Sequence, residues 1–247
     1  MPRLLVINPN TSALVSAMLQ HHVKAAVGHG LDVTTITARF GAPYISNESS
    51  YAVAGHAVLD AWAVACAKEL APDAVLLGCF GDPGLFALQE GAGVPVGGLA
   101  QAAFLEAATH GRFAIVTGGE RWKPMLERLA SSLGYADQLA GIHTVRQTGA
   151  ELAADPARAH VLLADACTKA AERFGVQAVI LGGAGLAGMA VDIAPQLPFA
   201  LIDSVEAGAR WAREAIAAPT RHTAAAVTPG RFGVDWQNVS WELSALR

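Results

Sequence analysis

A cysteine directly after a short apolar stretch is the residue of this chain best placed for chemistry. Residues 74–77 are all apolar and predict a strand buried on both faces. Gly78 and Cys79 follow at once, and a Gly- and Pro-rich turn at 81–84 ends the strand. Parallel sheets carry functional groups at the carboxyl ends of their strands, where turn N–H groups can lower a thiol pKa. The competing interpretation is a small buried core thiol, because free cysteine is among the most buried residue types.

A second stretch repeats this strand and turn. AVILGGAGLAG at 178–188 aligns without gaps with AVLLGCFGDPG at 74–84, at a constant offset of 178 − 74 = 104 residues. The shared Ala, Val, Leu and Gly positions indicate one unit used once in each half of the chain. The residue that corresponds to Cys79 is Gly183, which has no side chain to carry a proton.

The composition limits the class of protein. The 247 residues are 53% apolar and 15% charged, which is enough apolar content for a sizeable core. The net charge of −4, without a long Lys/Arg run, argues against a nucleic-acid partner. No apolar stretch is long enough to span a membrane, and no signal-peptide pattern is seen. Three cysteines, an odd number, fit a reduced protein, so we expect a cytoplasmic location.

Known cofactor and metal motifs are missing from the sequence. No GxGxxG follows the first strand, and there is no P-loop, no GxSxG elbow and no HExxH. The cysteines lack the spacing of metal ligands. We therefore expect neither a cofactor nor a bound metal, and chemistry that depends on a thiol, backbone N–H groups and hydroxyl-rich loops.

Strand and helix patterns alternate along the chain. This alternation predicts an α/β protein with parallel sheets. We expect strands at 4–7, 31–37, 74–77, 94–96, 112–116, 141–145, the start of 178–188, and 199–202. We expect helices at 13–27, 51–70, 85–90, 99–109, 122–134, 156–174 and 205–218, the last capped by Ser204, with an irregular tail from Pro219 onward.

Two polar loops follow the first strand of each half. NPNTS at 8–12 can simply turn the chain and cap the next helix, with Thr11 or Ser12 as the N-cap. It can equally present hydroxyls, an amide and helix N–H groups to an anion. The loop 117–120 is its counterpart in the second half. Together with the thiol, these groups suit proton transfer at a carbon next to a carbonyl.

Three segments resemble the signature regions of the hydantoin racemase family, part of the aspartate/glutamate racemase superfamily. They are INPNTS at 7–12, LGCFGDPGL at 77–85 and ILGGAGLAGM at 180–189, and the resemblance spans nearly the whole chain. It implies two similar, pseudo-twofold-related α/β domains with the active site between them and no cofactor. In that family two cysteines flank the substrate, one removing the α-proton and the other returning a proton to the far face.

The resemblance assigns roles to residues of this chain. Cys79 matches the first cysteine, and Gly183 stands where the second is expected. The residues expected to bind substrate come from the two polar loops, the two repeated turns and the loop after the second strand: Asn8, Asn10, Thr11, Ser12, Phe40, Ile45, Gly78, Phe80, Thr117, Gly118, Gly182 and Ala184.

The offset repeat also predicts the domain limits and the assembly. We expect one half to comprise residues 1–96 with 206–247, and the other 97–205, with the cleft between them. Trp236 and Trp241 lie in the non-periodic tail and favour docking on the chain's own core or on a neighbouring subunit. We expect a homo-oligomer that acts on a small molecule.

The glycine at 183 leaves the reaction open. The first interpretation is a hydantoin- or allantoin-racemase-like isomerase. The second is a decarboxylase resembling arylmalonate decarboxylase, which works with one cysteine, placed there in the second half. The third is a degenerate fold that binds small carboxylates or ureides. Cys66 and Cys167 do not replace the missing thiol, because both are predicted within helices. The substrate itself, whether a hydantoin, ureide, amino acid or malonate, stays open.

Overall fold

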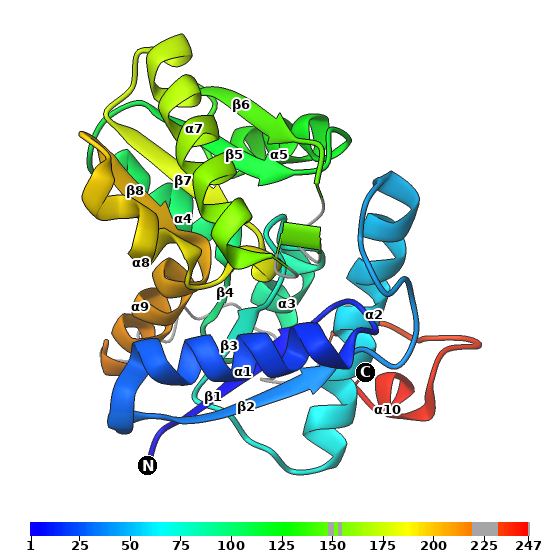
Figure 1. The fold of residues 1–247 in the computed structure, drawn as a ribbon. Coiled ribbons are helices and arrows are strands. Elements are labelled where there is room, and N and C mark those ends of the chain that lie inside the picture. The colour runs from blue at the N-terminus through cyan, green and yellow to red at the C-terminus, as the bar shows by residue number, and fades with distance from the viewer. Residues whose placement is uncertain (148–150, 153–154, 219–231, 247) are drawn as a thin grey trace.

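Two similar parallel sheets make up the fold. The structure is a computed structural model that describes residues 1–247 except 148–150, 153–154, 219–231 and 247. One sheet has the strand order β2-β1-β3-β4 and the other β6-β5-β7-β8, so both halves have the same topology. Every strand pair is parallel. The predicted α/β class with two similar halves is confirmed (Figure 1).

The first sheet and its helices occupy residues 3–98. They run β1 (Arg3–Asn8), α1 (Ala13–Val27), β2 (Asp32–Thr37), α2 (Glu48–Ala67), β3 (Ala74–Leu77), α3 (Leu85–Gly91) and β4 (Val96–Gly98). All four residues of β3 are buried, as expected for a strand covered on both faces.

The second sheet and its helices follow directly. They run α4 (Leu99–Ala108), β5 (Phe113–Gly118), α5 (Trp122–Ser132), β6 (Leu139–Val145), α7 (Pro156–Phe174), β7 (Ala178–Gly182), the 3-10 turn η2 (Ala184–Leu186), α8 (Met189–Ile193), β8 (Ala200–Asp203) and α9 (Ser204–Ala217). Among the described residues no helix is both long and apolar enough to cross a membrane.

The two halves exchange helices across their boundary. Helix α9 packs on β3 although it follows the second sheet, and α4 packs on β7 although it follows the first. Helices α4 and α9 also pack on each other. This crossing joins the two sheets through one helical layer. The domain limits 1–96 with 206–247 and 97–205 stay a prediction.

Several element ends differ from the prediction. Helix α2 begins at Glu48 rather than near 51, because Asn47 and Ser50 form a capping box. The N-cap of α1 is Ser12, one of the two residues predicted for this position, and its hydroxyl accepts the Val15 N–H. The N-cap of α9 is Asp203 and not Ser204, because the Asp203 carboxylate accepts N–H groups of the first turn.

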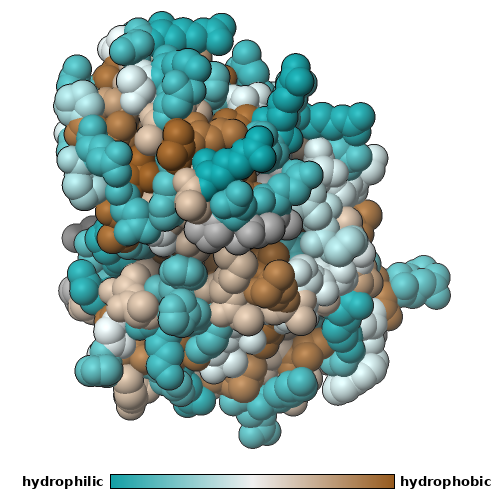
Figure 2. Space-filling model, viewed as in Figure 1, coloured by the Kyte–Doolittle hydropathy of each residue, from teal (hydrophilic) through white to brown (hydrophobic). Residues whose placement is uncertain are grey.

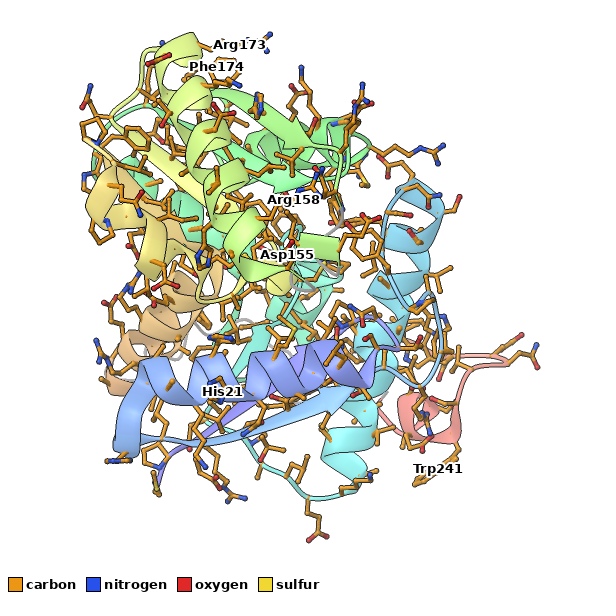
Figure 3. All side chains as sticks on the ribbon, in the orientation of Figure 1. His21, Asp155, Arg158, Arg173, Phe174 and Trp241 are labelled. Atoms are coloured by element: carbon orange, nitrogen blue, oxygen red, sulfur yellow. The ribbon has the colours of Figure 1, made fainter. Side chains whose placement is uncertain are left out.

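The carboxyl-terminal segment docks on the chain's own α2. Residues 219–231 of the predicted tail lie outside the described residues. Beyond them α10 (Trp241–Ser244) packs on α2, where Arg39 binds both Asp60 at 2.7 Å and Glu242 at 2.9 Å. The Trp241 side chain itself is 71% exposed and lies at the outer edge of the molecule (Figure 3).

Candidate active site

A cavity of about 640 Å³ lies where the carboxyl ends of the central strands of both sheets meet. The loops after β1 and β5 and the turns after β3 and β7 all contribute to it, as expected for parallel sheets. Its described lining residues are Asn10, Ser12, Leu14, Val15, Met18, Pro43, Tyr44, Ile45, Gly78, Cys79, Phe80, Thr117, Gly118, Trp122, Gly182, Gly183, Ala184, Gly185 and Leu186. Hydrophobic residues are visible in the middle of the face seen in Figure 2, and many residues around them are hydrophilic.

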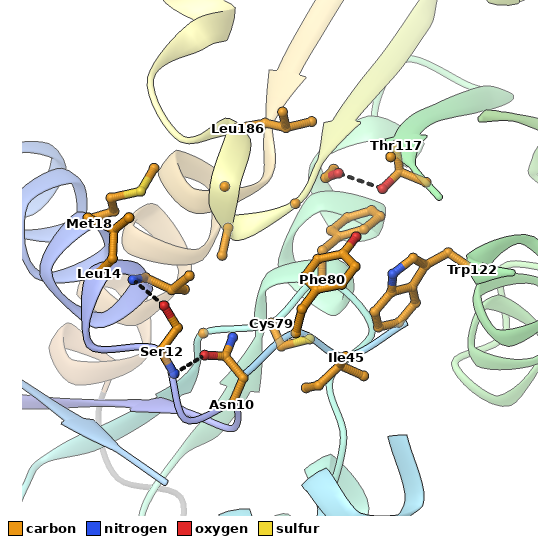
Figure 4. Close-up of a pocket in the computed structure, with 18 of the residues that line it drawn as sticks. Asn10, Ser12, Leu14, Met18, Ile45, Cys79, Phe80, Thr117, Trp122 and Leu186 are labelled. Carbon is orange, nitrogen blue, oxygen red and sulfur yellow. Dashed lines mark hydrogen bonds between the residues drawn. The ribbon is translucent and has the colours of Figure 1, made fainter. Parts of the chain in front are cut away.

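Cys79 is held in a tight turn directly after β3. The Asp82 N–H donates to the Cys79 carbonyl at 3.1 Å, and the Tyr51 hydroxyl donates to the Gly81 carbonyl at 2.8 Å. The Cys79 residue is 7% exposed and borders the cavity beside Ile45 and Asn10 (Figure 4). Within the described part of the chain, the N–H groups of Cys79 and Phe80 have no hydrogen-bond acceptor.

The expectation that the turn lowers the thiol pKa is wrong. Burial raises the pKa of Cys79 well above its usual range, and the Asp82 carboxylate raises it further. The turn N–H groups do not compensate for this loss of solvation. Cys79 is therefore a neutral thiol at neutral pH in this structure.

Gly183 stands in the equivalent turn after β7 and also lines the cavity. Its φ of +143° lies in a region that L side chains rarely adopt, and its N–H donates to the Ser204 hydroxyl at 3.2 Å. A Cβ placed there would meet only the Leu186 side chain, at 3.6 Å. The backbone angle, and not lack of space, makes glycine the fitting residue.

The loop after β1 is built around Asn8. Its side-chain amide is fully buried and donates to Asn10 Oδ1 at 3.0 Å, to the Ser12 carbonyl at 3.1 Å and to Ser16 Oγ at 2.9 Å. Asn8 therefore shapes the loop and does not line the cavity. Asn10 Oδ1 also accepts the Ser12 N–H at 2.9 Å, which leaves its amide nitrogen directed toward the cavity (Figure 4).

Thr117 takes the matching place in the second half. Its hydroxyl donates to the Gly182 carbonyl at 2.7 Å and is buried (Figure 4). That bond ties β5 to the end of β7, so the Thr117 hydroxyl proton is already used within the protein.

Most residues predicted to bind substrate line the cavity, and two in addition to Asn8 do not. Those that line it are Asn10, Ser12, Ile45, Gly78, Phe80, Thr117, Gly118, Gly182 and Ala184. Thr11 instead donates its N–H to the Ala42 carbonyl, and Phe40 packs edge-on against His56. Their place outside the lining argues against direct contact with substrate, while the binding role of the others stays a prediction.

The prediction missed an apolar wall. Leu14, Val15 and Met18 of α1 and Leu186 of η2 line one part of the cavity, and Trp122 another (Figure 4). Leu14 is 69% exposed in the first turn of α1. The available signal was the spacing of Leu14 and Met18, four residues apart and therefore on one helix face next to the NPNTS loop.

The described lining contains no Asp, Glu, Lys, Arg or His. Its polar side chains are neutral: an amide, hydroxyls, a phenol and an indole. Among the residues that the structure describes, no group of three or more His, Cys, Asp or Glu is placed to hold a metal ion. The site can therefore offer hydrogen bonds, apolar contact and one thiol.

The comparisons with known proteins agree on one family. The sequence profile described as Asp/Glu/Hydantoin racemase matches residues 4–212. A hydantoin racemase of Paenarthrobacter aurescens is 31% identical over 87% of this chain and 91% of its own, and one of Pseudomonas sp. strain NS671 is 29% identical over 84% and 83%.

Solved structures extend this likeness to the fold. An allantoin racemase from Klebsiella pneumoniae superimposes with a TM-score of 0.81 at 29% identity, over 87% of both chains. Arylmalonate decarboxylase, at a TM-score of 0.62 and 20% identity over 89% and 94% of the two chains, shares the fold alone. The chain belongs to the Asp/Glu/hydantoin racemase family and is a racemase-type isomerase.

Proposed function

We propose that this enzyme exchanges a proton at a carbon alpha to a carbonyl of a neutral, hydantoin-like ring, without a cofactor, through Cys79. The observation that carries the proposal is the position of that thiol, at the end of β3 and within a cavity shared with Gly183. The relatives named above as hydantoin and allantoin racemases support the choice of substrate class.

The groups around Cys79 suit such a reaction. Once Cys79 has lost its own proton, its thiolate takes the α-proton, and the negative charge that develops moves to the neighbouring carbonyl oxygen. The free N–H groups of Cys79 and Phe80 can stabilise that oxygen, as donors in an oxyanion hole do. The Ser12 hydroxyl and the Asn10 amide can hold a second carbonyl of the ring.

The uncharged lining favours a neutral ring over an amino acid or a dicarboxylate. A charged group that leaves water needs an opposite charge or several hydrogen bonds to offset its lost solvation. The described lining supplies no charged side chain. A hydantoin or a ureide needs only the hydrogen bonds and apolar surface that are present.

Gly183 favours exchange from one face only. Inversion needs a proton donor or acceptor on each face of the carbon, and the second turn has no titratable side chain at this position. The same observation supports the second candidate, a one-cysteine decarboxylase, in which a neutral thiol only delivers a proton after CO₂ has left. The third candidate is a protein that binds a small ligand in the cavity, in which the Cys79 thiol takes part in no reaction.

Incubation in D₂O separates these candidates. The enzyme is mixed with 5-substituted hydantoins, allantoin, aspartate and phenylmalonate, and NMR follows deuterium uptake while chiral chromatography follows inversion. We expect deuterium to enter a hydantoin faster than its configuration inverts. Loss of CO₂ from phenylmalonate would indicate the decarboxylase. Binding of these compounds without any chemical change would indicate a protein that only binds its ligand.

We also infer a homo-oligomer that works in the cytoplasm. The exposed Trp241 at the start of α10 supports an intermolecular contact, and the free state of Cys66, Cys79 and Cys167 suits a reducing compartment. Light scattering at micromolar concentration tests the first point, where a monomeric mass would contradict it. Fractionation of the source cells tests the second.

A further inference from the structure

A buried carboxylate closes the turn that carries the thiol. Asp82 is 1% exposed, lies three residues after Cys79 and has a φ of +51°, which is uncommon outside glycine. Its backbone N–H completes the turn by donating to the Cys79 carbonyl. A residue held in this conformation inside the protein needs firm support from its surroundings.

That support comes from the first turn of α4. The two oxygens of Asp82 accept the N–H of Ala100 at 3.0 Å and the N–H of Gln101 at 2.7 Å. The residue that precedes the helix, Gly98, offers no side-chain cap. Asp82 therefore caps a helix that packs on β7, the strand leading to Gly183.

The Asp82 carboxylate lies so close to Gly98 that no residue with a side chain fits at this position. A Cβ on Gly98 would lie 2.1 Å from the Asp82 carboxyl carbon, a distance that real Cβ atoms do not show. The contact between the Cys79 turn and α4 thus depends on a matched pair, a carboxylate on one side and a glycine on the other.

Among the described residues, the groups that face Asp82 include no cation. They are the Cys79 thiol in the same turn, the Tyr51 phenol from α2 and backbone N–H groups of Gly81, Ala100 and Gln101. Arg128 lies further out, with its guanidinium 5.9 Å from the centre of the Tyr51 ring. A negative charge on Asp82 therefore acts on the thiol without a neutralising partner.

We propose that Asp82 is a positioning residue that fixes the Cys79 turn on α4 and whose negative charge opposes thiolate formation at Cys79. The proposal deepens the proposed function, on which it rests only in taking Cys79 as the reacting group. Cys79 then enters each cycle as a thiol. A base must act on it, or a substrate must favour the thiolate through the nearby N–H groups, before it can remove a proton.

The test measures alkylation of Cys79 by iodoacetamide against pH, in a Cys66→Ser background and with the Cys79 peptide quantified by mass spectrometry. Asp82→Asn keeps the size of the side chain, removes its charge and retains one oxygen that can accept an N–H of α4. We expect its alkylation midpoint to fall by about one pH unit, which makes alkylation at a fixed pH about tenfold faster. Asp82→Glu, which restores the charge, should return the midpoint toward that of the parent.

The matched control is Asp203→Asn. Asp203 is also buried and caps a helix, through the N–H groups of Val205 and Glu206, but it lies at the end of β8 and binds the turn after β7 through the Gly188 N–H. We expect it to lower stability and to leave the Cys79 midpoint unchanged. An unchanged midpoint in Asp82→Asn would overturn the proposal, since a purely structural cap would change the rate and not the pH dependence.

Two further points keep the experiment decisive. Should Asp82→Asn fail to fold, Asp82→Ser, whose hydroxyl can still accept one N–H, takes its place with the same expected shift. Because alkylation needs no turnover, the result is independent of the D₂O experiment. Failure of the proposed function and failure of the proposed role of Asp82 are therefore seen separately.

Discussion

The turn after β3 and the turn after β7 occupy equivalent places in the two sheets and differ in chemistry. Both follow a buried strand, carry glycines at matching positions and are joined to a helix by a buried carboxylate. In the first turn the carboxylate is Asp82, which reaches out to α4. In the second it is Asp203 at the end of β8, which accepts the Gly188 N–H at 2.9 Å and also caps α9.

The two turns differ in what they present to the cavity. The offset of 104 residues places Leu186 opposite Asp82, and Leu186 lines the cavity while Asp82 does not. One turn therefore presents a thiol with a carboxylate behind it, and the other presents a bare backbone with an apolar side chain. The turns therefore hold equivalent places in the two sheets, but only the turn after β3 carries titratable side chains, Cys79 and Asp82.

The largest effect is expected from Cys79→Ser. A serine hydroxyl is a far weaker acid than a thiol, so deuterium exchange should slow by about 10³-fold or more, within the usual range for losing a general acid or base. Ligand affinity, measured by calorimetry, should change little, because the two side chains have similar size. Cys66→Ser is the control, since Cys66 lies near the end of α2 and outside the cavity lining. Full activity in Cys79→Ser would refute the mechanism.

The buried carboxylate of the first turn should make stability depend on pH. Burial raises the pKa of Asp82 from 3.8 to about 7. Between these values the folded protein keeps a proton that the unfolded chain has lost. The free energy of unfolding therefore falls as pH rises, by at most about 1.4 kcal/mol per pH unit.

Urea unfolding of the parent and of Asp82→Asn from pH 4 to pH 7.5 isolates this contribution. The parent's stability relative to the variant should decrease as pH rises through this range and level off above pH 7. The parent's free energy of unfolding relative to Asp203→Asn should also decrease as pH rises, because burial raises the pKa of Asp203 as well. A difference that stays constant with pH would show that Asp82 is not protonated in the folded state.

The matched glycines Gly78 and Gly182 should differ in their tolerance of a methyl group. A Cβ on Gly182 would lie 2.2 Å from the Phe80 ring, which is itself buried between the halves. A Cβ on Gly78 would lie 2.5 Å from the end of the Leu19 side chain, which can rotate. We expect Gly182→Ala to cost about 3 kcal/mol and Gly78→Ala about 1 kcal/mol, as over-packing against rigid and flexible neighbours does. Equal decreases in the free energy of unfolding of the two variants, measured with denaturant, would contradict this expectation.

The repeated strand–turn unit made much of the fold predictable. Helices α1 and α7 begin and end where the pattern placed them, because apolar spacing and caps agree there. The cleft followed from two strand–turn units in one chain, since parallel strands of both sheets end at the same place. Cys79 could be singled out from the sequence because it follows a buried strand at the start of a Gly- and Pro-rich turn, where parallel sheets carry functional groups.

What the sequence did not reveal depends on contacts between distant residues. The pKa of Cys79 is raised because water is excluded around the thiol and because the Asp82 side chain is buried beside it. The spacing of residues in the sequence reveals neither fact. The wall of Leu14, Met18 and Leu186 forms only when α1 meets the turn after β7. Thr11 was expected at the substrate from its polar loop and Phe40 from the family resemblance, and neither lies in the cavity lining.

The substitution Gly183→Cys would place a thiol in the second turn as well. There is room for the side chain, because the nearest atom to its Cβ is 3.6 Å away on Leu186. The φ of +143° is unfavourable for any L side chain, so we expect a loss of about 1–2 kcal/mol. With a thiol on each face, inversion of a hydantoin should approach the rate of deuterium exchange.

Gly183→Ala separates the thiol from the strain. It imposes the same backbone cost and adds no titratable group, so it should lose similar stability and gain no inversion. If the unaltered enzyme already inverts its substrate as fast as it exchanges deuterium, a group other than residue 183 serves the second face. The Gly183→Cys variant can also fold and bind the ring but still invert it far more slowly than it exchanges deuterium. That result would show that the two turns differ by more than the missing thiol.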